Sequence, residues 1–330
     1  MRRRDFIGLL GGVAAISRPL SVRAQQRDRA YVVGVIMIYA EGDPEGQERL
    51  SALREQLRRL GWVEDGKIRI EVRWAAGKTD LMRAHATEFV SLPADIMVVS
   101  STPVLAIVKA LTPKIPIVFT QVADPVGSGL VSNYVKPGGN ITGFTDSEGT
   151  VAGKWLEVLK EAAPFVNRLL VLRDPNNSVH QTFLTVIDTS AVSLRLEVST
   201  AAVRNQVEIE QAIAALAGDK DRGLLVLPGP VNNTNRQTII EQAARHRLPA
   251  IYPHEYYGRD GGLLCYGINQ QDQWSKAAVY VDRILKGEEP SELPVQAPTK
   301  YHLVINLKTA KALGLTMPPT LLARADEVIE

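Results

Sequence analysis

The strongest constraint on the fold is a regular alternation of apolar, strand-like runs with amphipathic helical segments. The first run, residues 31–38, is almost continuously apolar, as expected for a strand that is covered on both faces. A helical pattern follows through Leu50 and Leu57 and ends at Gly61. Strands and helices that alternate with short connections form parallel, doubly wound sheets. The sequence therefore predicts an α/β fold.

A turn-rich segment, residues 137–143, divides this alternation into two series. Each series spans about 110 residues, and a chain of about 300 residues exceeds what one hydrophobic core usually serves. We therefore predict two doubly wound parallel-sheet lobes of similar kind. Ligands of such sheets bind beyond the carboxyl ends of the strands, so two facing lobes would enclose a small-molecule cleft and close on it by a hinge.

The first 24 residues have the pattern of an export signal. Arginines at positions 2–4 precede a short apolar run, and small residues precede a cleavage site near Ala24. The apolar run is about half of the roughly 20 residues that a membrane helix needs, so no membrane insertion of the mature chain is expected. Residues 3–7 also resemble the twin-arginine export motif, but an ordinary secretory signal would need the same charges. We expect a periplasmic mature protein, with the export route left open.

Removal of the leader changes the charge of the protein. The whole chain carries +2, and the leader, with five arginines and one aspartate, accounts for +4, which leaves −2 on the mature chain. No cluster of Lys and Arg remains that could neutralise a row of phosphates. The composition therefore predicts a protein that does not bind nucleic acid.

The sequence shows no catalytic or metal-binding motif. Phosphate loops, dinucleotide-binding glycine patterns and nucleophile elbows are absent, and the five histidines are scattered. His254 and Glu255 are adjacent, but the second histidine of a zinc-protease motif is missing. We therefore expect a protein that is not an enzyme and has no metal and no cofactor.

Candidate binding residues stand at the ends of the predicted strands. Ser101 and Thr102 follow the apolar run 96–99 and precede Pro103, a residue typical of the first helical position. Either hydroxyl would cap that helix, and a helix N-terminus favours a ligand carboxylate. Thr120 and Asp124 follow the next strand, and Asp124 also fits the cap of a turn.

The second half offers polar residues in corresponding loops. Asp174 and Asn176 follow one apolar strand, and Pro228 follows another. Glu255 is the one acid of an aromatic-rich loop and could hold the ammonium group of a zwitterion, although a solvated position fits it as well. Tyr39 could add a ring face for a cation or an aromatic ligand.

Several long motifs make the chain similar to a known family. The mature chain resembles the ABC-transporter substrate-binding family that includes tryptophan- and tyrosine-binding members. The motifs that carry this resemblance are spread over both halves: residues 116–119, 123–126, 137–143, 303–315 and 318–326. The resemblance implies a type I periplasmic-binding-protein fold whose hinge is crossed three times. It divides the chain into lobe one at 27–142 with a late return from about 268–300, lobe two at 143–267, and a C-terminal segment 300–330 that fits either lobe.

The resemblance also implies a function and a binding site. The protein would be a monomeric solute receptor that delivers a small ligand, an amino acid or a related carboxylate, to ABC permease and ATPase subunits. A ligand-sensing module for a membrane receptor is the alternative. Related leucine, isoleucine and valine binders hold the ligand carboxylate at two strand ends of lobe one and its ammonium near an acid of lobe two. The matching positions here are Ser101, Thr102, Thr120, Val122 and Glu255.

Overall fold

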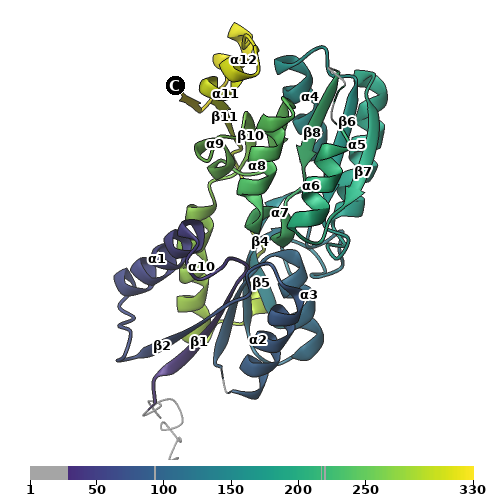
Figure 1. Cartoon of the computed structure of the whole chain (residues 1–330). Helices are drawn as coiled ribbons and strands as arrows, with labels where there is room; N and C mark the ends of the chain where they lie inside the picture. Colours follow the sequence, from purple (N-terminus) through teal and green to yellow (C-terminus); the bar gives the residue numbers. More distant parts are fainter. Residues whose placement is uncertain (1–28, 93, 217, 219–220) are drawn as a thin grey trace, which may run out of the picture.

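The computed structural model describes residues 29–330 except positions 93, 217, 219 and 220, so the predicted leader and its cleavage near Ala24 lie outside the described residues. Two α/β lobes stack end to end (Figure 1). The first holds a five-stranded parallel sheet in the order β2-β1-β3-β4-β5. Its strands are β1 (Tyr31–Met37), β2 (Ile68–Trp74), β3 (Ile96–Ser100), β4 (Ile117–Ala123) and β5 (Ile141–Ser147), and its helices are α1 (Pro44–Arg59), α2 (Thr79–Ser91), α3 (Thr102–Leu111) and α10 (Gln270–Leu285).

The second lobe holds a seven-stranded sheet in the order β12-β11-β10-β9-β8-β6-β7. All neighbouring strands are parallel except β10 and β11. The strands are β6 (Arg168–Arg173), β7 (Glu197–Ala202), β8 (Arg222–Val226), β9 (Ala250–Tyr252), β10 (Leu264–Gly267), β11 (His302–Asn306) and β12 (Glu327–Ile329). The helices are α4 (Val151–Ala162), α5 (His180–Leu194), α6 (Gln206–Ala214), α7 (Pro230–Thr234), α8 (Arg236–Arg245), α9 (Tyr256–Arg259), α11 (Leu307–Ala312) and α12 (Pro319–Leu322), and a 3-10 turn covers Pro290–Glu292.

This architecture confirms the predicted class of two doubly wound lobes and corrects one boundary. The predicted lobe boundary at residue 142 falls inside β5, which pairs with β4 as the fifth strand of the first sheet. The turn-rich residues before β5 form a loop within lobe one, because Ile117 N donates to Asn140 O and continues the β4–β5 pairing there. The first lobe therefore extends to about Ser147 rather than 142.

The chain leaves lobe two and then returns to each lobe once more. Helix α10 packs along α1, and its Trp274 and Tyr280 are buried in the core of the first lobe together with Leu293. The last thirty residues then add β11 and β12 to the second sheet. Figure 1 shows this division, with the yellow-green α10 in the lower lobe and the yellow end of the chain on the upper one. The hinge is thus crossed after β5, after β10 and before β11.

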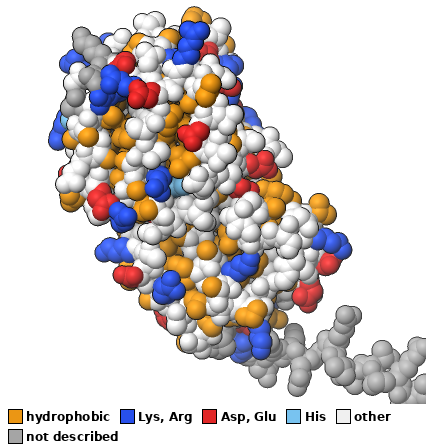
Figure 2. Space-filling view, turned by 90° about the vertical axis from the view of Figure 1, so that its right-hand side faces the viewer, with side chains coloured by type: hydrophobic (Ala, Val, Ile, Leu, Met, Phe, Trp, Pro, Cys, Tyr) orange, Lys and Arg blue, Asp and Glu red, His pale blue; other side chains and the backbone are white. Residues whose placement is uncertain are grey.

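Charges on the surface are interspersed. The face in Figure 2 carries Lys and Arg side chains intermixed with Asp and Glu over both lobes, and its described side chains form no basic stripe that would track a nucleic-acid backbone. None of the helices in the described part of the chain has the length and apolarity that a membrane span requires.

Candidate functional site

A cavity lies between the lobes, at the carboxyl ends of the strands of both sheets. Lobe one contributes residues that directly follow β1 and β3 and residues near the carboxyl ends of β4 and β5. Lobe two contributes the loops after β6, β8 and β9 and one residue of α7. Its lining consists of Ile38, Ser101, Thr102, Gln121, Ala123, Asp146, Asn177, Pro228, Gly229, Asn233 and His254.

The lobe-one wall of this cavity has a strained backbone. Ser101, directly after β3, has φ 81° and ψ 151°, a region that almost only glycine occupies. Gln121 in β4 has φ 53°, and Asp124 just after it has φ 38°. Each such conformation costs about 1–3 kcal/mol and is typical of ligand sites, where the surrounding structure enforces it.

Several polar atoms of the cavity lining, from both lobes, are buried without a hydrogen-bond partner among the described residues. These are Ser101 Oγ, Gln121 Oε1 and Asn177 Oδ1. Thr102 Oγ1 accepts from Ala123 N at 3.2 Å, which leaves the hydroxyl proton available for donation. An unpartnered buried polar group costs about 1–3 kcal/mol, so a polar ligand that pairs with these groups would recover that free energy.

Asp146 places a carboxylate in the cavity. It lies at the end of β5, its side chain is buried, and Ser147 Oγ donates to its Oδ1 at 3.0 Å. Burial raises the pKa of Asp146 to about 6, because the charged form loses its hydration. Sequence reasoning missed this residue, because the turn-forming composition of 137–143 indicates a break between halves rather than the approach to a buried strand. Its signal was an acid at the end of a Thr-containing run, residues 141–146.

A second chamber adjoins the first, and three of its lining residues are Trp155, Tyr266 and Tyr301. Asp146, Pro228 and His254 line both spaces, so the carboxylate stands at their junction. Trp155 lies fully buried in the chamber wall and donates from Nε1 to Tyr266 O at 2.8 Å. The remaining lining residues are Ser147, Pro253, Gly267 and Ile268.

Gly267 allows the wall of this chamber to close. A Cβ atom at this position would stand 1.8 Å from Pro253 O, which no side chain permits. The end of β10 therefore approaches the loop after β9 closely enough to narrow the space between them.

Three residues predicted from the sequence, Ser101, Thr102 and Pro228, line the cavity. Tyr39 and Thr120 are buried behind the lobe-one wall, where the Tyr39 hydroxyl accepts from Gln121 Nε2 at 2.9 Å and Thr120 Oγ1 has no partner among the described residues. The structure thus brings together the strand ends of lobe one as expected, with Gln121 as an additional lining residue.

The other predicted residues occupy positions outside the lining. Val122 is buried in the lobe-one core. Asp124 accepts from Gly127 N at 3.0 Å, as a turn cap does. Asp174 is buried and accepts from the backbone N of the exposed Asn176 at 2.9 Å, which organises the loop after β6. These side chains shape the loops around the cavity.

Glu255 is also outside the lining. Its carboxylate lies 3.9 Å from Arg259 and 4.0 Å from the His302 ring, and partial burial raises its pKa. The neighbouring His254 faces the cavity instead, and desolvation together with the nearby Arg49 lowers its pKa to about 3, so it is neutral. In the described part of the chain, no three His, Cys, Asp or Glu side chains are grouped as metal ligands would be.

Polar contacts cross the cleft beside the cavity. Gln270 of α10 donates from Nε2 to His254 Nδ1 of lobe two at 3.0 Å. The Gln270 Oε1 atom accepts from Gln121 Nε2 at 2.7 Å and from Arg49 at 2.6 Å. The Arg49 guanidinium also lies over the rings of Tyr39 and Tyr256, one from each lobe. These contacts join the two walls of the cleft.

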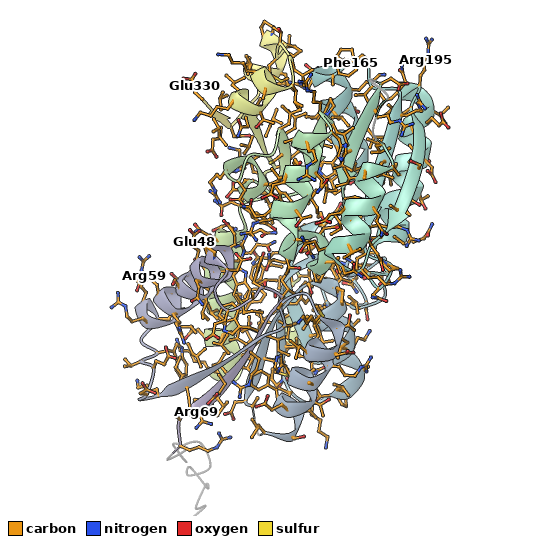
Figure 3. All side chains as sticks on the ribbon, viewed as in Figure 1. Glu48, Arg59, Arg69, Phe165, Arg195 and Glu330 are labelled. Carbon is orange, nitrogen blue, oxygen red and sulfur yellow. The ribbon has the colours of Figure 1, made fainter. Side chains whose placement is uncertain are left out.

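An ion pair holds the same edge of the cleft. Arg236 of α8 contacts Asp43 of lobe one at 2.7 Å and Asp260 of its own lobe at 2.7 Å. Asp43 precedes α1, whose N-terminal end faces lobe two: Figure 3 shows Glu48 near the boundary of the lobes and Arg59 at the far end. The lobes are therefore closed on each other.

Comparisons with known proteins show the family of the chain. The family model described as ABC transporter substrate binding protein matches residues 33–329. The chain belongs to this family. A tyrosine-binding protein of Clostridioides difficile is 28% identical over 258 residues, which cover 77% of this chain and 73% of that protein. The family match confirms the resemblance and the prediction of a solute-binding protein rather than an enzyme.

Two solved structures share this fold. The Streptococcus pneumonia ABC domain in complex with L-Trp has a TM-score of 0.83 at 24% identity and covers 91% of this chain and 100% of its own. The ligand-free, open structure of a Clostridium difficile substrate binding protein has a TM-score of 0.64 at 25% identity, with coverages of 91% and 99%. At equal coverage of this chain, the TM-score is higher for the L-Trp complex than for the open, ligand-free structure. The fold is that of type I periplasmic binding proteins, as predicted.

Proposed function

We propose that this protein is the extracytoplasmic component of an ABC importer and binds an amino acid with an aromatic side chain in the closed interlobe cavity. One observation carries this proposal. The cavity has unpartnered hydroxyl and amide groups on one side of a buried carboxylate and a chamber of aromatic side chains on the other. A zwitterion with an apolar ring fits that order of groups. The leader pattern and the family support a location outside the cytoplasm.

The carboxylate of the ligand would lie at the start of α3. Ser101 and Thr102 present hydroxyls there, and the helix N-terminus adds backbone N–H groups and the positive end of its dipole. Among the described residues that line the cavity there is no Lys or Arg, so the carboxylate would be held by these neutral donors. This assignment retains the sequence prediction for lobe one.

Asp146 would hold the ammonium group. Its carboxylate is buried and stands between the hydroxyl-lined cavity and the aromatic chamber, which is where the α-amino group of a bound amino acid would lie. A bound ammonium would neutralise a charge that burial now penalises. Asp146 thus takes the role that the sequence assigned to Glu255, whose carboxylate lies beside Arg259 instead.

Closure would couple binding to delivery. The ligand would contact Ser101 of lobe one and Trp155 of lobe two at once, so it favours the closed state over the open one by its contacts to both walls. The permease would recognise this state, and ATP hydrolysis would belong to the partner ATPase. The binding protein itself would perform no covalent chemistry.

Calorimetry on residues 25–330 tests the proposed function. We expect tryptophan, tyrosine or phenylalanine to bind with a Kd of about 1 μM or below, which corresponds to about −8 kcal/mol. Aspartate, lysine, glucose and uridine should bind at least about 100-fold more weakly, because each leaves an unpaired charge or polar group in the aromatic chamber. Preferential binding of a sugar or nucleoside would contradict the proposal.

Replacement of Ser101 tests the strained wall. We expect Ser101→Gly to raise the free energy of unfolding by about 1 kcal/mol, because glycine adopts φ 81° without strain. Ligand affinity should fall about tenfold, because one hydroxyl contact is lost. The matched control is Ser101→Ala, which should lose the same affinity without the gain in stability. Thermal unfolding and calorimetry measure the two effects, and unchanged ligand affinity in both variants would remove Ser101 from the site.

A further inference from the structure

Two tyrosines are shared by the aromatic chamber and an outer pocket. Tyr266 and Tyr301 stack with ring centroids 5.5 Å apart and an interplanar angle of 14°. Both residues line the inner chamber, and both also line an outer pocket. Glu148, Thr150, Val151, Lys154 and Pro298 form the rest of that outer pocket. The tyrosine pair is therefore a partition between two spaces.

The two tyrosines are anchored differently. Tyr266 belongs to β10, and its backbone carbonyl accepts from Trp155 Nε1, so its position is fixed by the sheet and by a buried indole. Tyr301 lies in the third crossing of the hinge, immediately before β11, and is half-buried. Its ring packs against the lobe-two core. Tyr301 is thus the member of the partition whose removal disturbs the sheet least.

We propose that the Tyr266–Tyr301 pair is the end wall of the ligand's side-chain subsite and that Tyr301 sets the maximum length of the ligand. This inference rests on the proposed function. With the ammonium at Asp146, the side chain of the ligand points into the chamber that this wall closes. The side chain of an amino acid with a single ring or a fused pair of rings ends in front of the tyrosine pair. A ligand extended along the ring axis requires one tyrosine to leave its stacked position, which loses the aromatic contact and exposes apolar surface.

The inference is tested with L-phenylalanine and 4-phenyl-L-phenylalanine, which differ by one ring along that axis. Wild-type protein should bind the extended ligand at least about tenfold more weakly than phenylalanine. Tyr301→Ala joins the inner chamber to the outer pocket, so it should bind the extended ligand about tenfold more tightly than the wild type does. Tyr301→Phe keeps the ring and should retain the wild-type preference. Circular dichroism and thermal unfolding establish that each variant is folded.

The possible results distinguish the proposed role of Tyr301 from the proposed function of the protein. If the wild type binds both ligands with equal affinity, Tyr301 does not limit the length of the ligand. A folded Tyr301→Ala protein that keeps the wild-type preference for phenylalanine would contradict the proposal as well. Tyr301→Leu, which keeps apolar volume without the ring, replaces Tyr301→Ala if the latter does not fold. If the wild type binds no amino acid, both the proposed function and the role of Tyr301 are refuted. If phenylalanine binds but Tyr301→Ala has the same length preference as the wild type, only the role of Tyr301 is refuted.

Discussion

Asp146→Asn is expected to bind its amino-acid ligand about 100-fold more weakly than the wild type, although the ligand-free variant is more stable. Loss of one partner from a buried charge pair costs about 2–5 kcal/mol of binding free energy. The ligand-free protein shows the opposite effect. At neutral pH its Asp146 carboxylate is ionised and desolvated, whereas asparagine carries no charge, so the substitution removes a cost of folding.

The raised pKa of Asp146 determines how the stability difference between the wild type and Asp146→Asn varies with pH. The pKa of Asp146 is raised from 3.8 to about 6 in the folded protein. The folded protein binds this proton more tightly than the unfolded protein does. The resulting stabilisation is fully present below about pH 4 and is lost as the pH rises through about 6. The loss amounts to about 1.4 kcal/mol for each pH unit that separates the pKa of the folded state from that of the unfolded state. The asparagine variant should therefore exceed the wild type in unfolding temperature at pH 8 but not at pH 4.

Ligand affinity should follow the opposite trend with pH. The ionised carboxylate attracts the ammonium group, so wild-type affinity should be highest above pH 6 and fall as the pH drops below it. Calorimetry between pH 5 and 8 measures this fall, which Asp146→Asn should lack. Glu255→Gln is the matched control, because its half-buried carboxylate lies beside Arg259 outside the cavity lining. A variant at position 146 with wild-type affinity at pH 8 would exclude Asp146 as the ammonium ligand.

Asp43→Asn is expected to release the ligand at least about tenfold faster than the wild type. Asp43 and Arg236 form a bidentate pair across the cleft, with distances of 2.7 and 3.1 Å, and both side chains are largely buried, at 10% and 11% exposure. Arg236 keeps Asp260 as a partner in either state, so its charge is not left unpaired. The lost interaction thus belongs to the closed state alone.

The choice of asparagine protects the helix that Asp43 begins. Asp43 Oδ1 accepts from Glu45 N at 3.0 Å as the N-cap of α1, and asparagine caps helices equally well. Stopped-flow fluorescence measures release, with Trp155 in the chamber wall as the reporter. Glu55→Gln is the control, because it removes an α1 carboxylate that pairs with Arg58 and Arg59 of the same helix. If both variants release ligand at the wild-type rate, the ion pair does not hold the closed state.

The sequence located the strand ends of the site but not the direction of each side chain. Ser101 and Thr102 were identifiable because two hydroxyls follow a buried strand and precede a proline that starts a helix. The loop after β9 was also found. Within it the sequence favoured Glu255, whereas the turn into α9 directs His254 toward the cavity. Adjacent residues of one loop face different neighbours, and only tertiary packing decides which of them meets the ligand.

Asp146 was missed for a different reason. Its strand, β5, contains Thr and Gly rather than a continuous apolar run, and it follows a segment with the composition of a domain linker. The burial of β5 comes from its pairing with β4 and from its packing against α10. Because α10 lies more than a hundred residues further along the chain, local composition cannot reveal that β5 is a core strand.

The triple crossing of the hinge has a consequence for how the chain is completed during synthesis. A nascent chain ending at Gly267 contains five strands of the first sheet, yet it lacks Trp274 and Leu293 from that lobe's core. The same fragment leaves β10 as an open edge, because β11 comes from residues 302–306. An uncovered edge strand invites pairing between chains. Lobe one therefore lacks part of its core until Leu293 and Val295 have been made, and lobe two lacks its last two strands until Ile329 has been made. No single cut divides this protein into two independent halves.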